Sequence, residues 1–169
     1  MDLNTKIFAK INALIGKNRF LDAFGRAGAE WAILAMAGWF FSSSLITYPS
    51  FRKSIFSFVI LGSAWGIGML INLGLAISVK SPRPYITDPN YKALVRALTS
   101  WRSFPSDQAM SAFVIFFTAT FLKLPGFWGL LLLAFWVIWG RVYVGVHYPL
   151  DILGGISVAL FTSLFVYSI

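Results

Sequence analysis

A histidine and an aspartate stand four residues apart in the stretch GRVYVGVHYPLD, residues 140–151. His147 is the single histidine of the chain, and a helix that begins near Pro149 would place Asp151 one turn from the imidazole. A carboxylate in that place can hold the imidazole in one tautomer and favour its charged form. The pair therefore suits catalysis, although a pair that only caps a helix at a membrane surface would look the same.

A second polar cluster, SFPSDQ at residues 103–108, stands where a polar loop meets a new apolar run. Ser106 suits the N-cap position, so free backbone N–H groups and the helix dipole would face any anion in the loop. Asp107 and Gln108 follow, and a glutamine can neither release nor accept a proton at neutral pH. Taken alone, this motif is explained equally well by a well-capped helix.

The third cluster is KSPRPY, residues 80–85, in which two prolines hold Arg83 on a stiff extended segment and Lys80 lies one turn before it. Arg141 closes the apolar run that precedes the histidine and aspartate. Two arginines, a lysine, a helix N-terminus and a His-Asp pair, all expected at one membrane face, favour a phosphoryl-transfer site over a set of independent caps.

The composition of the chain is that of a membrane protein, so membrane helices must position these residues. The chain has 169 residues, of which 58% are hydrophobic and 12% charged. Without cysteine there are no disulfides or thiolate metal sites, and with one histidine we predict neither a metal nor a cofactor. A formal charge of +8, confined to short loops, favours the phosphates of head groups or of a substrate. Nucleic acid is disfavoured because no long polar surface is available for it.

Five apolar runs, at about 31–48, 54–79, 108–122, 124–144 and 150–168, predict five transmembrane helices. Before them, residues 5–24 carry apolar side chains at helical spacing with lysines between, which predicts an interfacial amphipathic helix. We therefore expect an all-α membrane protein, a bundle of five transmembrane helices preceded by an N-terminal amphipathic interfacial helix. The domains would be an interfacial segment at 1–28 and a single transmembrane domain at 29–169.

The connections between these helices differ in character. The loop at 80–105 is long, polar and basic, so we expect the function there. The positive-inside rule would place this loop in the cytoplasm, but arginines that hold a substrate are not topology signals. Within the second run, GSAWG at 62–66 has a spacing of small residues that predicts close helix packing.

The three clusters resemble the type-2 phosphatidic acid phosphatase superfamily, whose motifs read KxxxxxxRP, PSGH and SRxxxxxHxxxD. The third motif keeps its spacing from Arg141 to Asp151 and lacks only the leading serine, which is Gly140. The middle motif reads PSDQ at 105–108, and the first keeps Arg83 followed by proline. The resemblance extends from about residue 31 to the C-terminus.

The resemblance implies that His147 is the nucleophile, forming a phosphohistidine, and that Asp151 orients it. It also implies that no metal is needed. The transferring phosphoryl group would be stabilised by Arg83, Arg141, Ser106 and the backbone at Asp107.

The chain departs from the family at two positions. Ala76 stands where the family has its lysine, and Lys80, one turn further on, is the candidate replacement. Gln108 stands where the family has the histidine that protonates the leaving group. An alkoxide, with a conjugate acid pKa near ~15.7, needs that proton, whereas a phosphate monoester with a second pKa of about 6 leaves readily as the anion. The altered motif therefore favours a diphosphate substrate, with Gln108 donating a hydrogen bond to the leaving phosphate.

The Pro-Ser-Asp wording is similar to a branch that includes bacterial undecaprenyl diphosphate phosphatases, which typically read PSDH. That branch implies an active site facing away from the cytoplasm in the bacterial plasma membrane, and recycling of the lipid carrier of cell-wall synthesis. Two alternatives stay open: a lipid monophosphatase acting on phosphatidic acid or phosphatidylglycerophosphate, and a catalytically weak phospholipid-binding pseudoenzyme. Glu30 and Asn72, polar residues in or beside apolar runs, receive no role, and the oligomeric state is not predicted.

Overall fold

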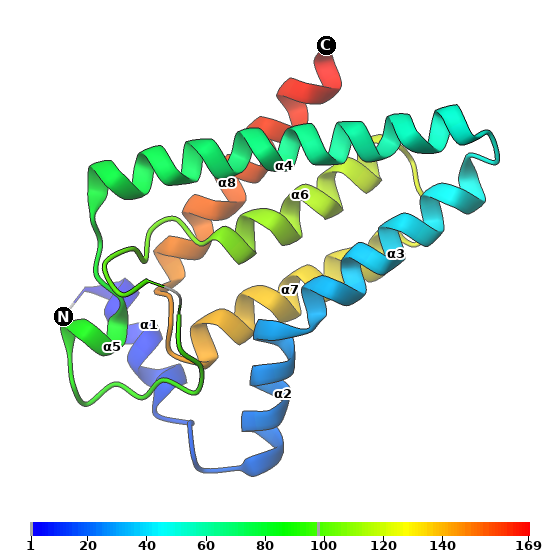
Figure 1. Ribbon diagram of the computed structural model, residues 1–169. Coiled ribbons are helices and arrows are strands. Elements are labelled where there is room, and N and C mark those ends of the chain that lie inside the picture. Colours follow the sequence, from blue (N-terminus) through cyan, green and yellow to red (C-terminus); the bar gives the residue numbers. More distant parts are fainter. Residues whose placement is uncertain (1, 98) are drawn as a thin grey trace.

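The fold is all-helical, as expected. The computed structural model describes residues 2–97 and 99–169, and over these residues the chain forms eight α-helices (Figure 1). They are α1 (Leu3–Asn12), α2 (Arg19–Glu30), α3 (Ala32–Thr47), α4 (Phe51–Val79), α5 (Pro84–Thr87), α6 (Asp107–Phe121), α7 (Phe127–Tyr143) and α8 (Pro149–Ser168). The five apolar runs correspond to α3, α4, α6, α7 and α8, with bounds within three residues of those expected.

Length and hydropathy qualify some of these helices as membrane spans. Over the described residues, two stretches are long and apolar enough to cross a bilayer, Phe51–Thr87 and Pro149–Ser168. A third span results if α2 and α3, which meet at an angle of 49°, are counted together. The apolar helices α6 and α7 are shorter than the ~20 residues that a perpendicular span needs. The apolar helices fit an integral membrane protein, while the number of five spans stays a prediction.

Helix α6 lies in the middle of the bundle and packs against α4, α7 and α8. Eight of its residues are buried, and methionine and phenylalanine side chains of α3 and α6 fill the core around it. Its contact with α8 is close, since a Cβ on Gly155 would lie 2.5 Å from the carbonyl oxygen of Ser106. A glycine at that position therefore lets the N-terminal turns of α6 and α8 meet.

Helices α3 and α4 meet at the turn that joins them and diverge toward the other end of the molecule (Figure 1). At the joined end, the buried hydroxyls of Ser44 and Ser57 form a hydrogen bond between the two helices. The prediction of close helix packing at residues 62–66 is wrong, because nothing lies within 4 Å of a Cβ placed on Gly62 or Gly66. Of these small residues, Gly62 lines the cavity described below, and Ala64 is buried in the core.

The N-terminal segment forms two helices, so the single helix expected over residues 5–24 is wrong. Gly16 has a left-handed conformation with φ +82°, and Asn18 caps α2 by accepting hydrogen bonds from the next turn. Phe8 of α1 is fully buried against the rings of Tyr91 and Tyr148. The interfacial position of this segment and the domain division at residues 28 and 29 stay predictions.

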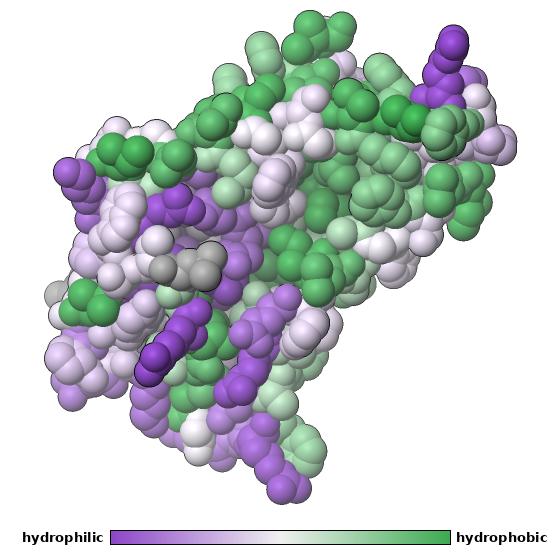
Figure 2. All heavy atoms as spheres, viewed as in Figure 1, coloured by the Kyte–Doolittle hydropathy of each residue, from purple (hydrophilic) through white to green (hydrophobic). Residues whose placement is uncertain are grey.

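The surface divides into two parts. Figure 2 shows apolar side chains over α3 and α4 and hydrophilic ones gathered at the end where α1 and α5 lie. The loop between α5 and α6 lies at this hydrophilic end (Figure 1). The polar clusters of the sequence therefore lie at the end where α3 and α4 have moved apart.

Candidate active site

Backbone hydrogen bonds connect the three polar clusters. The N–H of Ser103 donates to the carbonyl of Ser81 at 2.7 Å, and the N–H of Arg83 donates to that of Ser100 at 3.2 Å. The N–H of Ser106 donates to the carbonyl of Asp151 at 3.0 Å. Segments that are far apart in sequence are thus joined at one end of the bundle, as the sequence predicted.

Asp151 lies behind the imidazole of His147 in the first turn of α8, which begins at Pro149 as expected. Its Oδ2 accepts hydrogen bonds from the Ser103 hydroxyl at 2.6 Å and from the Tyr148 N–H at 2.7 Å. The same oxygen is 3.6 Å from Nδ1 of His147, and both side chains are buried. The carboxylate is therefore fixed by two short hydrogen bonds while it faces the ring at a slightly longer distance.

Arg83 determines which nitrogen of His147 carries the lone pair. Its Nη1 lies 3.2 Å from Nε2, and a guanidinium can only donate hydrogen bonds. Nε2 is therefore the acceptor, and the proton sits on Nδ1, where it faces Asp151. Burial, with a contribution from the charges of Arg141 and Arg83, lowers the pKa of His147 to about 4 although Asp151 acts to raise it. The ring is neutral, in contrast to the charged form that the carboxylate alone would favour.

Two buried arginines beside this histidine lack a carboxylate partner. Arg83 is 7% exposed and donates to the carbonyl oxygens of Thr99 at 2.6 Å and Val146 at 2.9 Å. Arg141 is 5% exposed and donates to the carbonyl of Ala29 at 3.4 Å, while its Nε has no partner. Because a buried charge without an ion-pair partner is costly, a bound anion would stabilise this pair.

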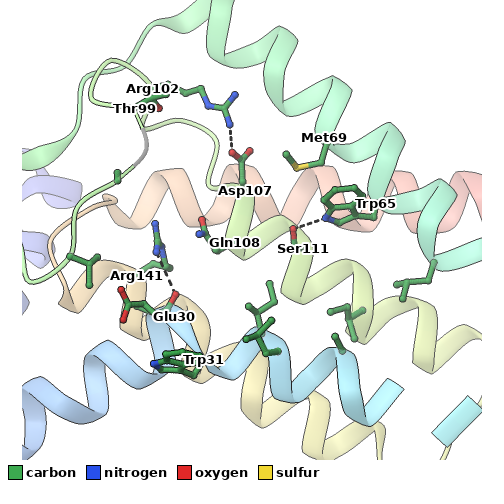
Figure 3. Close-up of a pocket in the computed structure, with 18 of the residues that line it drawn as sticks. Glu30, Trp31, Trp65, Met69, Thr99, Arg102, Asp107, Gln108, Ser111 and Arg141 are labelled. Carbon is green, nitrogen blue, oxygen red and sulfur yellow. Dashed lines mark hydrogen bonds and ion pairs between the residues drawn. The ribbon is translucent and has the colours of Figure 1, made fainter. Parts of the chain in front are cut away.

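A cavity of about 1010 Å³ begins at these arginines (Figure 3). Its polar end is lined by Arg83, Arg96, Thr99, Arg102, Asp107, Gln108 and Arg141. Its apolar end runs between α3 and α4 along Ile33, Leu34, Phe41, Phe58, Leu61, Trp65, Met69 and Ile115. His147 does not line the cavity itself, and its Nε2 contacts the guanidinium of Arg83, which does.

The middle motif has the expected helix start. Ser106 caps α6, its hydroxyl accepting from the N–H of Ala109 at 3.4 Å. The side chains of Asp107 and Gln108 reach the cavity, and their N–H groups belong to the first turn, which has no partners inside the helix. Lys80 behaves differently: it is exposed in a left-handed turn that ends α4, and it does not line the cavity. The structure therefore does not join Lys80 to the site.

Three residues at the site received no role from the sequence. Ser103 donates to Asp151, Arg102 pairs with Asp107, and Asn72 donates to Asp107 at 3.0 Å. Asn72 gave a signal, as a polar group in an apolar helix. Arg102 and Ser103 gave none, because their partners are determined by the path of the loop. Within the described ranges, no group of three or more His, Cys, Asp or Glu side chains could hold a metal ion.

Comparison with known sequences places these motifs in a family. The sequence profile of the PAP2 superfamily matches residues 57–169. Undecaprenyl-diphosphatase BcrC of Bacillus subtilis (strain 168) is 30% identical over 158 residues, which cover 94% of this chain and 79% of that protein. Putative undecaprenyl-diphosphatase YbjG of Escherichia coli (strain K12) is 40% identical over 77 residues, 44% of this chain and 37% of that protein.

Solved structures have the same architecture. Aquifex aeolicus LpxE superposes with a TM-score of 0.76 and 25% identity, over 100% of this chain and 97% of that chain. The PAP2 type phosphatidylglycerolphosphate phosphatase from Bacillus subtilis gives a TM-score of 0.54 at 22% identity, over 98% of this chain and 92% of that chain. The second likeness concerns the fold alone.

Proposed function

This chain belongs to the PAP2 superfamily and is a membrane lipid phosphatase, and we propose that it hydrolyses undecaprenyl (polyprenyl) diphosphate to the monophosphate and phosphate. The observation that carries the proposal is the cavity, in which two buried arginines that form no salt bridge with any described residue lie at one end and an apolar groove at the other. Such a cavity suits a ligand with a highly charged head and a long apolar tail.

In the first step, Nε2 of His147 attacks the terminal phosphorus of the diphosphate. A nitrogen–phosphorus bond forms, and the bond from that phosphorus to the bridging oxygen breaks, so the lipid monophosphate leaves with the electron pair. Arg83 and Arg141 turn toward the equatorial oxygens of the phosphoryl group, where the charge of the transition state lies. The proton on Nδ1 stays in place facing Asp151, whose carboxylate stabilises the cationic phosphohistidine.

In the second step, a water oxygen attacks the same phosphorus and the nitrogen–phosphorus bond breaks. The water proton passes to solvent or to the departing phosphate, and the ring returns to its neutral form. The low pKa of His147, about 4, keeps Nε2 unprotonated at neutral pH, so each cycle begins with an available lone pair.

Gln108 supports a diphosphate as the substrate. General acid catalysis is worth roughly 100- to 10,000-fold, and an enzyme without it needs a leaving group that departs as an anion. The lipid monophosphate is such a group, since its second pKa is about 6. The Gln108 side chain lines the cavity next to the first turn of α6, where its amide can donate a hydrogen bond to that leaving phosphate.

The lipid tail would lie between α3 and α4. Several side chains along this groove are exposed on the apolar side of the molecule, among them Leu34 at 60% and Trp65 at 46%. The groove is thus open sideways, toward the lipid phase. We further propose that the protein lies in the bacterial plasma membrane with its active site facing away from the cytoplasm. Hydrolysis there would recycle the lipid carrier of cell-wall synthesis.

The first test is phosphate release by the purified protein in detergent, comparing undecaprenyl diphosphate with phosphatidic acid. We expect release from the diphosphate and its loss in His147→Ala. Release from phosphatidic acid alone would identify a monophosphatase, and release from neither would identify a phospholipid-binding protein.

A second test concerns the leaving group. We expect Gln108→His to gain activity on phosphatidic acid, because the imidazole supplies the proton that an alkoxide needs. The diphosphate activity should change much less. If the variant gains nothing on monophosphates, the leaving-group argument for a diphosphate substrate fails.

A further inference from the structure

Arg102 lies at the polar end of the cavity and is part of none of the three family motifs. It belongs to the loop before α6, and its side chain, 20% exposed, forms an ion pair with Oδ2 of Asp107. The other carboxylate oxygen of Asp107 accepts from Nδ2 of Asn72, on α4, at 3.0 Å. Asn72 is 1% exposed, so a buried side chain of a long helix fixes Asp107 and, through it, the guanidinium of Arg102.

The cavity is lined by more arginines than the buried pair at His147. Four arginines and two carboxylates, Asp107 and Glu30, line it, which leaves two positive charges in excess. Arg83 and Arg141 are the buried pair at His147, so they serve the phosphoryl group that is transferred. A diphosphate brings a second phosphate, which needs a cation of its own in the same cavity.

One face of α6 shows where that second phosphate would lie. Gln108, Ser111 and Ile115 line the cavity at spacings of three and four residues, so they form a single stripe from the polar end into the groove. A substrate with its terminal phosphate at His147 and its tail along this stripe places the lipid-linked phosphate at the beginning of α6. Arg102, paired with Asp107, extends into the cavity at this point (Figure 3).

We propose that Arg102 binds the lipid-linked phosphate and that Asp107 is its resting partner, exchanged for the phosphate when the substrate enters. This inference rests on the proposed function. The ion pair is suited to exchange because its side chains are 20% and 28% exposed, and ion pairs in contact with water contribute little stability. A guanidinium has five N–H donors in a planar fork, so it binds a phosphate as readily as a carboxylate.

The test measures the affinity for inorganic pyrophosphate and orthophosphate by calorimetry, on His147→Ala protein so that nothing is turned over. Adding Arg102→Gln should weaken pyrophosphate binding about 10- to 100-fold and orthophosphate binding far less. Adding Asp107→Asn should instead tighten pyrophosphate binding, because the phosphate no longer competes with a carboxylate for the guanidinium of Arg102. Arg26→Gln removes one positive charge from an exposed residue of α2 outside the cavity, and serves as the matched control.

A residue that only anchors the loop gives a different result. Both Arg102→Gln and Asp107→Asn break the same ion pair, so an anchor predicts that both variants weaken both ligands together. That result overturns the inference. Equal affinity of the His147→Ala protein, without a further substitution, for pyrophosphate and orthophosphate would overturn it as well. Turnover of undecaprenyl diphosphate by the wild-type protein is measured separately, so failure of the proposed function and failure of the Arg102 site are distinguishable.

Discussion

The serines at the turn between α3 and α4 and the polar groups around His147 differ in how fully their buried atoms are hydrogen-bonded. At the turn between α3 and α4, the serine clasp, formed by Ser43, Ser44, Ser54 and Ser57, has a hydrogen-bond partner for every hydroxyl. At the other end, among the residues that the structure describes, Nδ1 of His147, Nε of Arg141 and Oδ1 of Asn72 are buried without a hydrogen-bond partner, and elsewhere in the bundle so are the hydroxyls of Thr118 and Ser163.

The difference separates structural from functional polar groups. An unpaired buried donor or acceptor costs stability, and the clasp shows that this chain can pair such groups when the task is only to hold two helices together. Of the open groups at the arginine end, Nε of Arg141 is a donor that a bound phosphate would pair. This contrast predicts that substitutions around His147 will lower activity more than stability, and that substitutions in the clasp will lower stability more than activity.

The largest effect is expected at Asp151. Asp151→Asn keeps the size of the side chain but removes the charge that faces Nδ1 of His147 and stabilises the phosphohistidine. Turnover should fall about 10,000-fold, in line with the same loss at other His-Asp pairs. Single-turnover rates of phosphate release would check this, and a melting curve would confirm that the variant is folded. A variant within tenfold of wild type would contradict an orienting role for Asp151.

Arg141→Met should separate activity from stability most clearly. We expect a loss of about 100- to 1,000-fold in kcat/KM, because one donor to the transition state disappears. The melting temperature should stay level or rise, since an apolar side chain replaces a buried charge whose partner is one carbonyl oxygen at 3.4 Å. A strong drop in melting temperature would show that Arg141 holds the fold together and would break the contrast.

The pH dependence should also differ between the ends. In the unfolded chain a histidine titrates near ~6.5, whereas burial lowers the pKa of His147 to about 4 in the folded protein. Between these values the unfolded chain binds more protons, so stability should fall as the pH is lowered from about 6.5 to 4. Melting curves over this range test it. Relative to the wild type, His147→Asn should have a flatter profile, and Ser57→Ala should keep the wild-type slope.

The smallest effect is expected at the clasp. Ser57→Ala removes a hydroxyl that donates to the carbonyl of Ser54 and is hydrogen-bonded to the hydroxyl of Ser44. The free energy of unfolding should therefore fall by about 1 kcal/mol. Activity at a permissive temperature should stay within twofold. Denaturation in detergent and phosphate release on the same preparation provide both numbers. A loss of activity larger than the loss of folded protein would show that the clasp takes part in catalysis.

Much of the fold could be predicted from the sequence because its signals are local. Apolar runs predicted α3, α4, α6, α7 and α8, and the spacing of His147 and Asp151 predicted the start of α8. The break at Gly16 was missed because lysines and apolar residues continue at helical spacing across it, while the turn depends on a left-handed φ of +82°. Charge alone suggested Lys80, yet the turn after α4 directs it away from the cavity.

The contacts of the long loop could not be predicted in this way. Asn12 of α1 accepts from the backbone N–H of Lys92 at 3.0 Å and donates to its carbonyl at 2.8 Å, across eighty residues of sequence. Such pairs arise from the tertiary path of the chain, and no spacing rule finds them. The same reason hid Arg102 and Ser103, whose partners are known only once the loop is folded.

The groove between α3 and α4 has a consequence for which lipids can be processed. The rings of Phe41 and Phe58, whose centroids are 4.5 Å apart, line this groove, and its side is bordered by exposed residues such as Leu34. A tail longer than the groove can leave sideways and continue among the bilayer lipids. Under the proposed function, isoprenoid carriers with different numbers of units would therefore present the same first segment to the groove, and selection would depend on the head group.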